Sequence, residues 1–76
     1  MIKSATILTA QALDSLAIDH ITQIANTMIN NGVIAEVTID GDIIVLTGIF
    51  QRGINQAMLA IGSYIKHNLS IEWICE

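Results

Sequence analysis

The sequence predicts an α+β domain in which two helices cover one face of a four-stranded, mostly antiparallel sheet. Two segments carry apolar residues at the three- and four-residue spacing of amphipathic helices. Between them lie two β-rich runs joined by an Asp-Gly turn signal, and further β-rich runs precede the first helix and follow the second. This order, β-α-β-β-α-β, packs most simply as the split βαβ or ferredoxin-like arrangement.

Composition predicts one small domain with a surplus of apolar surface. The 76 residues are near the lower end of what folds unaided, so we expect residues 1–76 to form a single domain. Hydrophobic residues make up 53% of the chain and charged residues only 13%, well below the charged share of an ordinary globular protein. Part of the surface must therefore be apolar, and extended apolar surface usually marks a binding partner.

The first strand and the first helix are predicted over residues 2–9 and 10–30. Thr9 is the expected N-cap, because its hydroxyl can accept a hydrogen bond from a free amide of the first turn. Gly32 is the expected stop, because glycine adopts the left-handed conformation after a helix without a side-chain clash. The apolar stripe of this helix consists of Leu13, Leu16, Ala17, Ile21, Ile24, Ala25 and Met28.

A β-hairpin is predicted next, with strands at 34–40 and 43–49. The Asp-Gly pair at 40–41 suits the centre of a type I′ turn, which would place Val37 opposite Ile44. A three-residue turn would move this register by one residue. In either case one alternating pair of the second strand lies on the face away from the core: Ile43 with Val45, or Ile44 with Leu46.

The second helix is predicted over residues 51–67, with Asn68 as a cap. Gly53 and Gly62 are expected to weaken it. Residues 69–76 alternate between apolar and polar side chains, as a last strand does. The apolar positions of the helix are Ile54, Ala57, Met58, Ile61 and Ile65.

The third strand is interior in a ferredoxin-like sheet, so a strand that is apolar on both faces suggests a partner on the open face. We expect residues such as Ile43 and Val45 to contact that partner, because strands buried on both faces are typical of covered sheets. Two alternatives stay open: these side chains share the face with their neighbours, or the C-terminal tail folds over them. The interface candidates are Ile43, Ile44, Val45, Leu46 and Arg52, the last being the one basic residue placed at a helix start to hold an anion.

No set of residues in the sequence predicts catalysis. His20 shares the apolar stripe of the first helix and is interpreted as a border histidine bonded to a backbone carbonyl, rather than as a base. Asp19 cannot pair with it, because helix neighbours point about 100° apart. Cys75 is interpreted as a small core residue. No metal-ligand spacing or phosphate-binding loop is present. We therefore expect no enzyme, no catalytic residue, no cofactor and no metal.

Charge and hydropathy limit the partners. The net charge is -4, and three bases cannot line a phosphate backbone, so nucleic-acid binding is not expected. No apolar run approaches the ~20 residues of a membrane span. No signal peptide is visible, and a single cysteine fits a reducing compartment. We therefore expect a cytoplasmic protein.

Residues 10–74 resemble the BON domain. The resemblance is carried by a strand, the Asp-Gly pair, an apolar strand ending in Leu46-Thr47-Gly48, and a helix with Ala57 and Ala60. It implies a non-enzymatic binding module, a class that is often periplasmic and tied to membranes or to other copies. The chain departs from it in its N-terminal strand, in a glycine just after Arg52 and in the missing leader.

Three functions are compatible with these observations. The leading one is a small interaction module that self-associates, as a homodimer or a higher oligomer, through its open sheet face or an edge strand. The second is an inhibitor or adaptor of the kind encoded by phages and mobile elements, which occludes a site on a larger protein. The third is a sensor that binds a small molecule between subunits.

Overall fold

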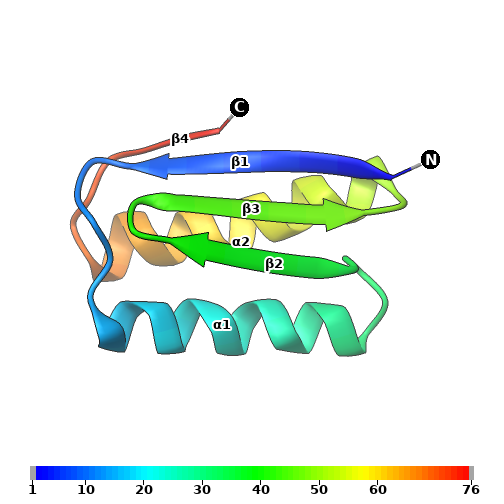
Figure 1. The fold of residues 1–76 in the computed structure, drawn as a ribbon, viewed down its shortest axis with the longest axis horizontal. Coiled ribbons are helices and arrows are strands. Elements are labelled where there is room, and N and C mark those ends of the chain that lie inside the picture. The colour runs from blue at the N-terminus through cyan, green and yellow to red at the C-terminus, as the bar shows by residue number, and fades with distance from the viewer. Residues whose placement is uncertain (1, 76) are drawn as a thin grey trace.

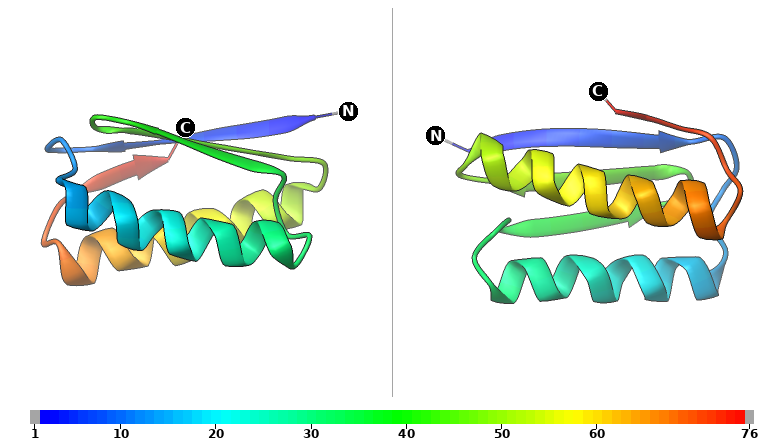
Figure 2. Two further views of the ribbon diagram at one scale, coloured as in Figure 1. Left: turned by 60° about the horizontal axis from the view of Figure 1, so that its bottom comes forward. Right: turned by 180° about the vertical axis from the view of Figure 1, so that it is seen from behind.

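The fold has two layers, a four-stranded sheet and a pair of helices on one of its faces (Figures 1 and 2). The computed structural model describes residues 2–75, and for Cys75 the backbone alone. The predicted α+β class and the order β-α-β-β-α-β are confirmed. The elements are β1 (Lys3–Thr9), α1 (Ser15–Asn30), β2 (Glu36–Asp40), β3 (Ile43–Gly48), α2 (Gln51–Asn68) and β4 (Trp73–Cys75).

The strands lie in the order β2-β3-β1-β4, and all neighbours are antiparallel. The third strand of the chain is therefore interior, as predicted. The last strand is shorter than predicted, because Leu69 caps α2 and Ser70 adopts a positive φ of 54° before the chain reaches the sheet. The predicted cap at Asn68 is wrong, since that residue is the last of the helix. The predicted end of the strand at Glu76 lies outside the described residues.

The hairpin turn differs from the prediction by its central residues. Gly41 and Asp42 occupy the centre, with a positive φ at Gly41 only, as a type II′ turn requires. Val37 consequently pairs with Leu46, two residues from the predicted partner. Because side chains alternate with a period of two, this shift leaves unchanged which side chains of the two strands share a face.

The first helix begins five residues later than predicted, and its N-cap is Asp14 instead of Thr9. A carboxylate oxygen of Asp14 accepts a hydrogen bond of 2.8 Å from the amide of Ala17. The buried Thr9 hydroxyl donates instead to the carbonyl oxygens of Gln11 and Asp42. Residues 10–14 therefore form a connection that ties the start of α1 to the hairpin turn.

The first helix ends as predicted, at a glycine with a positive φ. Gly32 has φ 76°, and the amide of Val33 donates to the carbonyl of Met28 at 2.8 Å. The amide of Gly32 donates to the carbonyl of Ile29, which completes the hydrogen bonds of a Schellman motif. This end fixes the direction in which the chain enters β2.

The core lies between the helices and the sheet. The predicted stripe of the first helix is correct except for Leu16, which is 67% exposed in the first turn of α1. Leu13 is also buried, although it lies in the connection before the helix and not in the helix itself. The core consists of Ala5, Ile7, Leu13, Ala17, Ile21, Ala25, Ile34, Ile44, Leu46, Ile54, Ala57, Ile61 and Ile65.

The two glycines of α2 lie where the helix makes close contacts with neighbouring segments. A Cβ at Gly53 would overlap the carbonyl oxygen of Val33, in the connection between α1 and β2. A Cβ at Gly62 would lie 2.5–2.7 Å from the indole ring of Trp73 on β4. The helix therefore packs against these neighbours more closely than any larger residue would permit.

Candidate interaction surfaces

The sheet face opposite the helices, here called the open face, has no helix or strand of residues 2–75 over it (Figure 2). The side chains of this face alternate with those of the core, and Ile74 belongs to it because its neighbour Trp73 packs against α2. The open face consists of Ser4, Thr6, Leu8, Glu36, Thr38, Asp40, Ile43, Val45, Thr47 and Ile74.

The structure separates the two predicted pairs of β3. Ile44 and Leu46 are fully buried under the helices, so they are core residues and not interface residues of the folded domain. Ile43 is 38% exposed and Val45 is half-buried, and both belong to the open face. The sequence left open which alternating pair of β3 lies away from the core, and the structure shows that it is Ile43 and Val45.

Apolar side chains of the open face gather at the end near the hairpin turn. Leu8 on β1 pairs with Ile43 on one side and with Ile74 on the other, and Val45 follows along β3. Ile74 is 63% exposed, and Leu8 is half-buried. These four residues, Leu8, Ile43, Val45 and Ile74, are called the apolar block. The remaining residues of the face are threonine, serine and two acids at the β2 edge.

Arg52 does not join the apolar block. It is exposed in the first turn of α2, at the opposite end of the molecule from the hairpin turn (Figure 1). The N-cap residue of this helix, Phe50, makes no side-chain hydrogen bond to it. The predicted set of interface residues is therefore divided between the open face, the core and a helix start.

A second apolar surface, which the sequence analysis did not predict, lies around the α1–β2 connection and the β3–α2 connection. Ile2, Ile49 and Phe50 are 77, 61 and 65% exposed. The last two also line a pocket of about 200 Å³. The signal in the sequence is the pair Ile49-Phe50, two large apolar residues in a connection, where polar residues are usual. The other residues of the pocket are Gly32, Val33, Ile34 and Ala35.

His20 is exposed on α1 and lies against Tyr64 of α2, with ring centroids 5.8 Å apart. The contact observed for this residue is thus aromatic packing between the helices, where a hydrogen bond to a backbone carbonyl had been expected. Within the described residues, no group of three or more His, Cys, Asp or Glu side chains could hold a metal ion. The side chain of Cys75, predicted to be a core residue, lies outside the described part of the structure.

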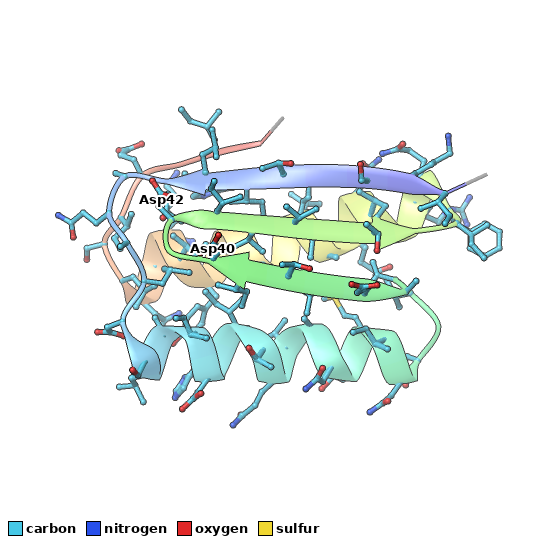
Figure 3. All side chains as sticks on the ribbon, in the orientation of Figure 1. Asp40 and Asp42 are labelled. Carbon is cyan, nitrogen blue, oxygen red and sulfur yellow. The ribbon has the colours of Figure 1, made fainter. Side chains whose placement is uncertain are left out.

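Two acids lie at the hairpin turn: Asp40 directly precedes it, and Asp42 is its second central residue (Figure 3). In the part of the chain from residue 2 to 75, neither helix has the length and hydropathy needed to cross a membrane.

No protein-family model matches the sequence, and no curated protein matches it. The resemblance to the BON domain stays a prediction.

Proposed function

We propose that this chain is a small, non-enzymatic protein–protein interaction module that self-associates through the open face of its sheet. The observation that carries the proposal is the apolar block, which joins side chains from three strands on a face without a covering layer. An antiparallel sheet with one wet face ordinarily places polar residues there. The apolar block is unnecessary for the core, which is complete on the other side.

The free energy gained by covering the apolar block is large relative to the stability of the domain. Burial of apolar area contributes ~25 cal/mol per Å², so covering two aliphatic side chains contributes about 3 kcal/mol per subunit. The whole stability of a domain of this size is about 5 kcal/mol. Association through the open face would therefore stabilise the fold measurably at concentrations above the dissociation constant.

The size of the face predicts a weak interface. The strands lie about 4.8 Å apart and rise about 3.4 Å per residue, so β1 to β4 with their unequal lengths present roughly 340 Å² in projection. A standard interface buries about 800 Å² on each partner. We therefore expect a contact at the weak end of specific association.

A reducing compartment such as the cytoplasm suits this chain, because its single cysteine can form no internal disulfide.

The test is the average mass of the protein in solution as a function of concentration, measured by light scattering. Ile43→Lys places a charge in the apolar block and should lower the average mass at every concentration where the parent associates. Ser4→Lys places the same charge at the polar end of the same face and serves as the matched control. A monomeric parent at millimolar concentration, or equal masses for the parent and Ile43→Lys, would contradict the proposal.

A further inference from the structure

The molecule is 32 Å long, and its two ends differ in chemistry. One end holds the start of β1, the α1–β2 connection and the β3–α2 connection (Figure 1). It is called the loop end. The other end holds the hairpin turn, the start of α1 and the end of α2, and is called the turn end. The loop end carries more cations than acids, and the turn end carries more acids than cations.

The loop end combines the pocket with positive charge. Lys3 pairs with Gly48, the residue directly before Ile49. Arg52 follows Phe50 by two residues, in the first turn of α2. Glu36 is the one acid at this end among the described residues. The pocket therefore lies at an end of the molecule that carries two cations and one acid.

The turn end combines an exposed leucine with negative charge. Leu16 is 67% exposed in the first turn of α1. It stands between Asp14 and Asp19 in the sequence. The hairpin turn is held beside this segment by the hydrogen bond from the amide of Leu13 to the carbonyl of Gly41, 3.0 Å. Asp42 of that turn adds a third acid at this end, and Asp40 lies next to the turn on the open face (Figure 3). The end of α2 contributes one cation here, Lys66 in its last turn.

We propose that the loop-end pocket receives Leu16 from the turn end of a second copy of this chain. The apolar side chain would enter the pocket between Ile49 and Phe50, and the acids around it would face Lys3 and Arg52. The like-charged turn ends of the two copies would be separated by about the 32 Å length of the molecule. That distance is several times the Debye length of about 8 Å at physiological salt, so their repulsion is screened while the contact itself is not.

Such a contact joins two different surfaces, so it is heterologous and builds open chains or closed rings. The open-face contact proposed above joins a surface to itself. The two contacts use different residues, and the head-to-tail inference does not rest on the open-face proposal. Both can be present in one assembly.

The heterologous character supplies the experiment, a mixing test in the Ile43→Lys background, where the open-face contact is blocked. Phe50→Glu disables the pocket and leaves Leu16 intact, while Leu16→Glu disables the leucine and leaves the pocket intact. Both positions are exposed, so both variants should keep the fold, which circular dichroism verifies. Asn26→Glu, at an exposed position in the fourth turn of α1, is the charge-matched control.

We expect the Ile43→Lys protein and the Asn26→Glu control to form assemblies of increasing mass with concentration, and each disabling variant alone to be monomeric by light scattering. A mixture of the two disabling variants should form a dimer and nothing larger, with an affinity that falls at least tenfold between 50 mM and 500 mM salt. A monomeric Ile43→Lys protein would overturn the head-to-tail contact and leave the open-face proposal intact. A mixture no heavier than its separate components would also overturn it.

Discussion

Alternate residues of β3 face two different environments. Ile44 and Leu46 lie under the helices and are fully buried, whereas Ile43 and Val45 lie on the open face, where Ile43 is 38% exposed. All four side chains are aliphatic. The covered side needs them for the core, but threonine or serine would suffice on the other side, as they do over much of the open face. This difference is the reason for our proposal that the aliphatic residues of the open side serve a contact outside the folded monomer.

The largest expected effect comes from a charge on the covered side. Ile44→Lys removes a buried isoleucine, at a cost of about 2–5 kcal/mol, and buries an unpaired ammonium group. The sum exceeds the ~5 kcal/mol stability expected of such a small domain. The variant should show no cooperative unfolding transition by circular dichroism. A folded Ile44→Lys protein would mean that the helices do not cover this side as tightly as described.

An intermediate effect on stability should come from one methyl group added to α2 at a glycine that packs closely against a neighbouring segment. Gly53→Ala should lower the free energy of unfolding by about 2 kcal/mol, because the Cβ meets the backbone carbonyl of Val33. Gly62→Ala should cost less, because its obstacle is the Trp73 side chain, which can shift, and alanine favours the helix by up to ~1 kcal/mol. Urea denaturation of both variants measures the difference. Equal costs, or a larger cost at Gly62, would show that the backbone contact at Val33 is looser than described.

The smallest effect on stability should come from Ile43→Lys, the matched change on the open side. Its free energy of unfolding, measured by urea denaturation in dilute solution where the protein is monomeric, should change by less than ~1 kcal/mol. The lysine chain can lie along the sheet and extend its ammonium group into water. A loss comparable to that of Ile44→Lys would show that the two sides of β3 are equally buried.

The fold was predictable because its signals are local. The stripe of α2 and the glycine after α1 follow from side-chain spacing and from backbone conformational preference, and both are confirmed. The start of α1 was not predictable in the same way. Thr9 and Asp14 are both good N-caps, and the choice depends on Thr9 bonding to Asp42, 33 residues away.

The register of the hairpin depended on a choice that the local sequence leaves open. Gly41 can take the first or the second central position of a two-residue turn, and each choice gives a different partner for Val37. For a two-residue turn, which residues share a face was nevertheless predictable, because the two registers differ by two residues and so share the same alternation.

The candidate surfaces were predictable only in part. The sequence shows that β3 is apolar on both sides, but which side faces the helices follows from the pairing with β1 and β2. The loop-end pocket requires residues near 33 and 49 to meet, which no local pattern indicates. Arg52 was singled out for its place at a helix start, and its relation to Phe50 emerges only from the assembled end of the molecule.

The most direct measurement is a dilution series followed by the isoleucine methyl resonances. Sixteen isoleucines report on both sides of the sheet, and the Phe50→Glu variant removes the head-to-tail contact. On dilution from millimolar to micromolar concentration, the methyl signals of Ile43 and Ile74 should shift, while those of Ile44, Ile54 and Ile61 stay constant. Signals that do not depend on concentration, or shifts confined to isoleucines away from the open face, would contradict association through the apolar block.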